Sequence, residues 1–116
     1  MRITRLYTGT DNQSHFEDIE VPFESRGDFG LFTLPEPAKA VFFREIPAGY
    51  EYPWHCVICR EYVVMIDGAV EIGVGSGEKR VFKKGDVLLA EDQTGQGHRT
   101  RVVGKKQWRQ VFVTLP

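Results

Sequence analysis

The two-residue turn Asp67-Gly68 is the sequence feature that most constrains the fold of this chain. It joins residues 62–66 and 69–74, two segments rich in β-branched and aromatic side chains. An Asp-Gly pair between such segments favours a tight hairpin turn, because the turn needs positive φ at its central positions. The sequence therefore predicts an antiparallel hairpin near the middle of the chain.

Segments of similar composition recur on both sides of this turn, and glycines and prolines separate them. We predict further strands at residues 41–46, 80–82, 87–90, 99–103 and 108–115. Strands at such even spacing are typical of a sandwich or barrel, so the predicted fold class is all-β. Residues 1–34 are harder to assign and are predicted to form an N-terminal arm or edge strand that packs on a barrel of residues 35–116.

Length and charge limit the classes of function. The 116 residues match the commonest size of one domain. The net charge is -1, and charged residues are scattered along the chain. The sequence therefore has no cluster of positive charge that would bind nucleic acid or an anionic membrane. No segment approaches the run of roughly 18 apolar residues that spans a bilayer, and the N-terminus lacks an apolar signal core. We therefore expect a cytoplasmic protein without nucleic-acid or membrane partners.

The two cysteines, Cys56 and Cys59, form a C-x-x-C pattern. This pattern is compatible with a redox pair, half of a zinc site or two unrelated thiols. A redox pair belongs at the start of a helix in a βαβ unit, and a four-cysteine zinc site needs a second pair that is absent here. We expect free thiols. Cys59 remains an alternative metal ligand, because it lies near a turn where strand alternation does not set its direction.

Three residues with metal-binding side chains are His55, Glu61 and His98. Side chains two apart on a strand share a face, so one inward face of the barrel can hold both His55 and Glu61. A carboxylate inside a barrel is costly unless it is paired or bound to a metal. The alternative for Glu61 is therefore a salt bridge with Arg60 or Arg101.

The spacing around His55 resembles the first motif of the cupin family. In that motif Gly, five residues, His-x-His, three or four residues, Glu, six residues and Gly follow one another. Gly49, His55, Val57, Glu61 and Gly68 stand in this order with matching spacings. One ligand is missing, because Val57 stands where the second histidine of the motif usually stands.

Gly85-Asp86 resembles the opening of the second cupin motif, and His98 resembles the histidine of that motif. Glu91 replaces the usual proline, and His98 lies two residues later than the standard count. Residues 91–101 are also similar to a subgroup of small bacterial cupins. The resemblance covers about residues 35–116, roughly the length of one compact domain. It implies a double-stranded β-helix, or jelly-roll, barrel.

The resemblance also implies a divalent metal site formed by His55, Glu61 and His98. Two imidazoles and a carboxylate leave positions open for water or substrate, and they are compatible with Zn, Fe, Mn, Ni or Cu. The alternative is a barrel that has lost its metal, in which the two histidines form hydrogen bonds inside a ligand pocket.

This fold hosts many reactions, so the expected activity is broad. We expect a metal-dependent dioxygenase, isomerase or lyase that acts on a small polar metabolite, or else a non-catalytic ligand-binding or regulatory cupin. Glu91 and Asp92, beside His98, are candidates for a general acid or base, with a solvated loop as the alternative. The residues expected to line the pocket are Val57, Val63, Met65 and Thr100.

Strand alternation also separates the outer surface from the pocket. Arg99 and Arg101 alternate with Thr100 and should face away from the pocket. Residues 62, 64 and 66 form an apolar outer face opposite Glu61, from which we expect a homodimer.

Overall fold

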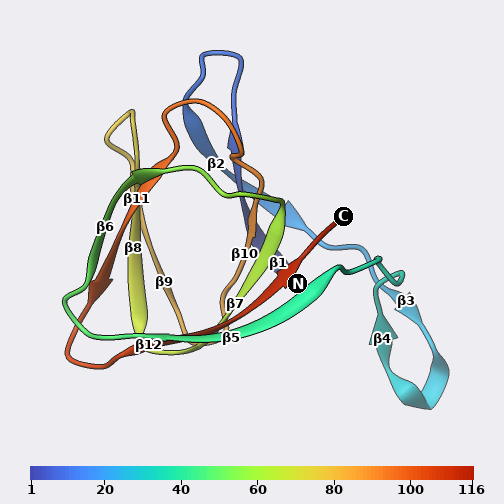
Figure 1. The fold of residues 1–116 in the computed structure, drawn as a ribbon. Helices are drawn as coiled ribbons and strands as arrows, with labels where there is room; N and C mark the ends of the chain where they lie inside the picture. The colour runs from blue at the N-terminus through green and yellow to red at the C-terminus, as the bar shows by residue number, and fades with distance from the viewer.

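The computed structural model describes residues 1–116, and it contains β-strands and one short 3₁₀ helix but no α-helix. This confirms the predicted all-β class (Figure 1). The elements in chain order are β1 (Arg2–Thr8), β2 (Ser14–Glu20), β3 (Glu24–Ser25), η1 (Gly27–Phe29), β4 (Leu31–Phe32), β5 (Ala40–Ile46), β6 (Glu51–His55), β7 (Glu61–Asp67), β8 (Ala69–Val74), β9 (Lys79–Lys83), β10 (Val87–Ala90), β11 (His98–Val103) and β12 (Trp108–Thr114).

Two sheets face each other and form the barrel. The larger sheet has the strand order β2-β1-β10-β7-β12-β5, and the smaller sheet has the order β6-β11-β8-β9. In Figure 1 the smaller sheet lies on the left, β1, β7 and β10 lie on the right, and β5 and β12 cross the bottom. From β5 onward the chain crosses repeatedly between the two sheets, and the space between them holds the core and the candidate site.

The predicted hairpin at Asp67-Gly68 is wrong in its pairing. The turn is present, but β7 pairs with β10 and β12, whereas β8 pairs with β9 and β11. Gly68 has a φ of 76°, and a Cβ there would lie 2.3 Å from the backbone oxygen of Gln107. The glycine therefore forms a tight corner between the two sheets. The pairing was not predictable, because a local turn signal does not specify which strands become neighbours.

The N-terminal strands are part of the larger sheet. β1 pairs in parallel with β10, with Thr4 opposite Leu88, and antiparallel with β2. Leu6 of β1 is fully buried in the core. β1 and β2 fall in the segment predicted as an arm or edge strand, and β6 was not among the predicted strand segments. A parallel pairing between residues far apart in the chain leaves no local turn signal to predict it from.

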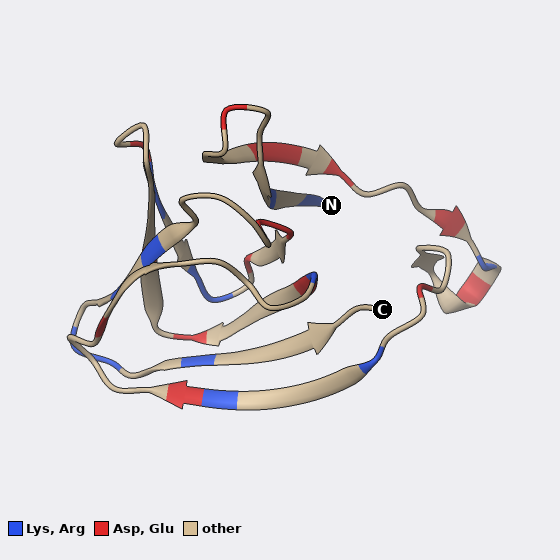
Figure 2. Ribbon diagram, turned by 45° about the horizontal axis from the view of Figure 1, so that its top comes forward, with Lys and Arg blue, Asp and Glu red and all other residues tan.

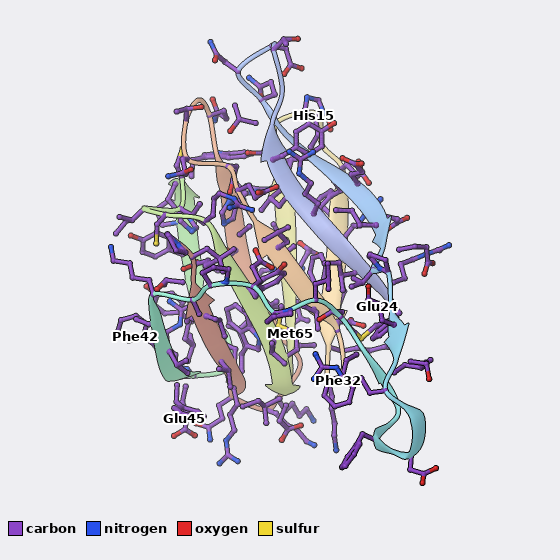
Figure 3. The ribbon with its side chains drawn as sticks, turned by 90° about the vertical axis from the view of Figure 1, so that its right-hand side faces the viewer. His15, Glu24, Phe32, Phe42, Glu45 and Met65 are labelled. Atoms are coloured by element: carbon purple, nitrogen blue, oxygen red, sulfur yellow. The ribbon has the colours of Figure 1, made fainter.

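Eleven buried side chains form the main core between the sheets. They are Leu6, Val63, Met65, Val70, Ile72, Val74, Phe82, Leu88, Ala90, Val102 and Trp108. Met65 lies in the middle of the molecule (Figure 3), and its sulfur accepts a hydrogen bond of 3.2 Å from the Trp108 indole N–H. Part of this core forms the floor of the pocket described below.

The hairpin of β3, η1 and β4 projects from the barrel (Figures 1 and 2). Its side chains Phe29 and Leu31 are 85% and 67% exposed. Acidic and basic residues are interspersed along the rest of the ribbon (Figure 2), and several pair between neighbouring strands, as Arg2 does with Glu20. None of the structure's helical segments has the length and apolarity to cross a bilayer.

Candidate functional site

A pocket of about 840 Å³ opens between the two sheets, and 15 of its 23 lining residues are hydrophobic. Its walls come from β5, β6, β7, β11 and β12, and core residues such as Val63 and Leu88 form its floor. This volume and this mostly apolar lining are typical of a site for a small molecule. His55, Glu61 and His98 all line this pocket.

His55 and His98 lie side by side because β6 and β11 pair antiparallel, with these two residues opposite each other. Their ring centroids are 4.3 Å apart, with 56° between the ring planes. The preceding Gly97 has a φ of 75°, and a Cβ there would lie 2.1 Å from the backbone oxygen of His55. Only glycine therefore allows the two strands to approach closely enough to bring the imidazoles together.

Both imidazoles use the same ring nitrogen for a protein contact. His55 Nδ1 donates to the Pro53 carbonyl oxygen at 2.8 Å, and His98 Nδ1 donates to Asp92 Oδ2 at 2.6 Å. Each Nε2 is left without a hydrogen-bond partner in the protein. A fixed donor at Nδ1 makes Nε2 the lone-pair nitrogen, which can bind a metal or accept a proton.

Asp92 was a candidate general acid or base, and the structure gives it a different role. It is fully buried, and its Oδ2 also accepts a hydrogen bond of 2.7 Å from the hydroxyl of Ser14, which is fully buried as well. Its Oδ1 has no partner. Residues 93–96 of this loop are exposed, but the Asp92 side chain is not solvated. Asp92 instead acts as the group that orients His98.

Glu61 also lines the pocket, and no hydrogen bond or salt bridge holds its carboxylate. Arg60 pairs with Glu91 and Arg101 pairs with Glu71, so neither of the predicted alternatives neutralises Glu61. Burial raises the pKa of Glu61 above its ordinary value, and the charge of Arg44 opposes this rise. Burial likewise lowers the pKa of His55, which favours the neutral imidazole.

No protein-family model matches the chain. A structure from Klebsiella pneumoniae, described as an uncharacterized conserved protein with a double-stranded beta-helix domain, matches 72% of this chain and 72% of its own, with 22% identity and a TM-score of 0.56. The cupin domain of Schizosaccharomyces pombe Cnp3 matches 97% of this chain and 87% of its own, with 18% identity and a TM-score of 0.54. This chain has the cupin fold. The comparison confirms the predicted double-stranded β-helix.

Two curated relatives of the cupin chain carry names from fungal biosynthesis clusters. Oryzines biosynthesis cluster protein J of Aspergillus oryzae is 34% identical over 103 residues, which are 88% of this chain. Phomopsin biosynthesis cluster protein C' of Diaporthe leptostromiformis is 36% identical over 72 residues, which are 61% of this chain. The matched regions span only 55% and 36% of these relatives' own lengths.

Cupins often bind metals, and the donor chemistry of this pocket fits a metal in part. His55 and His98 present two imidazole nitrogens together, but no group of three or more His, Cys, Asp and Glu side chains is gathered closely enough to hold an ion. Cys56 and Cys59 are free thiols in the pocket lining.

The other predicted site residues of the cupin barrel fall in three places. Val57, Val63 and Thr100 line the pocket. Met65 lies outside the lining and is buried against Trp108. Glu91, the candidate catalytic carboxylate, also lies outside the lining, where it pairs with Arg5 and Arg60.

Arg44 is a pocket residue that sequence reasoning missed. It comes from β5, whose even-numbered side chains from Ala40 to Ile46 all line the pocket. Its guanidinium lies over the ring of Phe112, 4.3 Å from the centroid. Alternation along residues 41–46 could have placed Arg44 on one face of the strand, but nothing local indicates that this face borders a cavity.

Proposed function

We propose that this cupin is an enzyme that binds a small metabolite in the barrel pocket and acts on it at His55 and His98. The observation that carries the proposal is the pair of free Nε2 atoms, held together in a mostly apolar pocket. Ionisable groups with shifted pKa values in a cleft are typical of a reactive centre, and Glu61 and His55 are two such groups.

We propose that a divalent metal would be held by His55, His98 and Glu61, the imidazole and carboxylate side chains that line the pocket. A bound metal would supply Lewis-acid chemistry or a bound water of lowered pKa. The protein's own residues have separate roles. Asp92 fixes the orientation of His98, and the apolar walls hold the body of the metabolite and exclude water. Burial raises the pKa of Glu61, which makes it the carboxyl group of the pocket best suited to hold a proton when it is not bound to a metal.

The reaction is of the dioxygenase, isomerase or lyase type. The names of the curated relatives, which refer to biosynthesis clusters, support an activity on small molecules. The chain matches about half or less of those proteins, so an activity shared with them is part of the proposal.

Metal analysis of the untagged protein tests the proposal. We expect close to one divalent ion per chain in the wild type and a large loss of metal in His98→Ala and Glu61→Gln. Arg26→Met, in the projecting hairpin, is the control and should retain the metal. A stoichiometry well below one that His98→Ala does not change would contradict a metal at this site.

A metal-free ligand-binding cupin is the second candidate. It is favoured by Val57 at the position of the missing histidine and by the absence of a gathered group of three donors. A panel of small molecules in a thermal-shift assay distinguishes the two, because a ligand of the folded state raises the apparent stability. Equal stabilisation with and without a chelator supports this second candidate, whereas stabilisation that the chelator abolishes contradicts it.

We also propose a homodimer. Its support is the apolar outer side of β7, where Ile66 is 41% exposed, together with the exposed outer side of β5, where Phe43 is 80% exposed. Light scattering at tens of micromolar should give twice the chain mass, and a monomeric mass would refute the dimer.

A further inference from the structure

Arg44 is a cation in the pocket wall without a carboxylate partner. Six of the chain's arginines form salt bridges, and Arg44 is not one of them. The two others without a salt bridge, Arg26 and Arg99, stack on aromatic rings away from this pocket. Arg44 is therefore the one arginine that lines the pocket, and it has no salt bridge there; the charge of Glu61 acts on it only from a distance.

The guanidinium of Arg44 is held in place before any ligand binds. The side-chain amide of Gln110 is oriented so that both its oxygen and its nitrogen face suitable partners. In this orientation the amide oxygen accepts hydrogen bonds from Arg44 Nε at 2.6 Å and from Arg44 Nη2 at 3.1 Å. Gln110 is fully buried, and Phe112 supports the face of the guanidinium. This contact uses the Nε edge and leaves the N–H groups of Nη1 without an acceptor. An ordered donor fork binds more tightly, because less side-chain freedom is lost on binding.

The surroundings of Arg44 are suited to a ligand that combines an anionic group with an apolar body. Phe42, Tyr50 and Trp108 line the same pocket, and desolvation by these walls lowers the pKa of Arg44. Reduced contact with water strengthens the attraction between a guanidinium and an anion. Glu61 is the only carboxylate in the lining, and no salt bridge joins it to Arg44.

We propose that the metabolite bound in this pocket carries a carboxylate that pairs with Arg44 and an apolar or aromatic body that fills the space between Arg44 and the two histidines. The inference names the ligand class and rests on the proposed function for the pocket as the binding site. A carboxylate is favoured over a phosphate because phosphate sites usually combine several donors, such as a helix N-terminus, and the pocket lining comes from strands and loops.

Matched pairs of acids and amides test this inference in an NMR titration of the intact protein. The probes are benzoate and phenylacetate, each with its neutral amide, together with phenyl phosphate. We expect both acids to bind at least roughly tenfold more tightly than their amides, since a charged hydrogen bond is lost in the amide. Phenyl phosphate should bind more weakly than benzoate.

Variants assign the effect to a residue. Arg44→Met, which keeps an apolar stem of similar length, should lose the preference for acids, and Arg44→Lys should retain part of it. Arg26→Met is the matched control, because Arg26 also stacks on a phenylalanine but lies outside the pocket. Lys39→Met tests the other cation of the pocket lining and should leave the preference unchanged.

Any one of four results would contradict the binding of an acid by Arg44: equal binding of acids and amides, an acid preference that survives in Arg44→Met, a preference that depends on Lys39 instead, or no binding of either acid up to about 10 mM. Tighter binding of phenyl phosphate would overturn the carboxylate assignment. Failure of the metal proposal would look different, because a metal-free protein can still show an acid preference that Arg44→Met removes.

Discussion

Glu91 and Asp92 are neighbours in the chain, yet their carboxylates lie in opposite surroundings. The Glu91 side chain is 15% exposed and binds Arg5 and Arg60 outside the pocket lining. Asp92 is fully buried and binds His98 and Ser14. Adjacent residues in extended chain point in opposite directions, so one carboxylate reinforces the outside of the barrel while the other orients a pocket histidine. Glu91 therefore contributes to stability alone, whereas Asp92 contributes both to stability and to the site.

Asp92→Ala should have the largest effect. It leaves the Nδ1–H of His98 and the hydroxyl of Ser14 buried without their acceptor, and we expect a loss of about 3 kcal/mol in the free energy of unfolding. Metal affinity at the histidine pair should fall as well, by roughly tenfold or more, because His98 loses its orienting partner. Urea unfolding and metal titration measure the two effects. A loss of stability under about 1 kcal/mol would contradict the assigned network.

Ser14→Ala should cost less, about 1.5 kcal/mol, because Asp92 keeps its contact with His98. Combined with Asp92→Ala, it should add little, since both changes remove the same hydrogen bond. The measurement is a double-mutant cycle in urea. Simple additivity of the two losses would show that the hydroxyl and the carboxylate do not interact.

Glu91→Ala should cost about 1 kcal/mol, because it breaks two partly exposed ion pairs. It should leave metal and ligand binding in the pocket unchanged, in contrast to Asp92→Ala. The same unfolding and titration experiments apply. A change in pocket affinity as large as that of Asp92→Ala would mean that the two carboxylates are not separated in function.

The pH dependence of the Glu91 cluster should be the smallest effect. Desolvation raises the pKa of Glu91, but the hydrogen bonds from Arg5 and Arg60 outweigh it and lower the pKa below the ordinary value of 4.5. The ionised form is therefore the stabilising one. Its contribution is complete above the ordinary pKa and is lost as the pH falls through the lowered value.

Glu91→Gln makes this contribution measurable. Its deficit in stability relative to the wild type should be well below about 1 kcal/mol and largest near about pH 6, and it should shrink toward about pH 3. Melting temperatures across this range provide the readout. A deficit that grows on acidification would reverse the sign assigned to Glu91.

The sequence determined the fold class and several of the strands. β8 and β10 span residues 69–74 and 87–90 as predicted, and β5, β7, β9, β11 and β12 differ from the predicted segments by no more than one residue at either end. These elements could be predicted because glycine and proline mark strand ends locally and because β-branched residues favour the extended backbone. The cupin resemblance, carried by residues such as His55 and Gly68, also pointed to the correct barrel.

Only the tertiary structure decided which strands are neighbours and which side chains meet. The turn at Gly68 joins two sheets instead of closing a hairpin, β1 lies against β10, and Ser14 reaches Asp92 from 78 positions away. Met65 shares a strand with Val63, but its contact with Trp108 places it in the core instead of the pocket lining. The metal-ligand roles of His55, Glu61 and His98 remain predictions. Strand pairing, burial and pocket shape depend on contacts between distant segments, and no local pattern of residues encodes them.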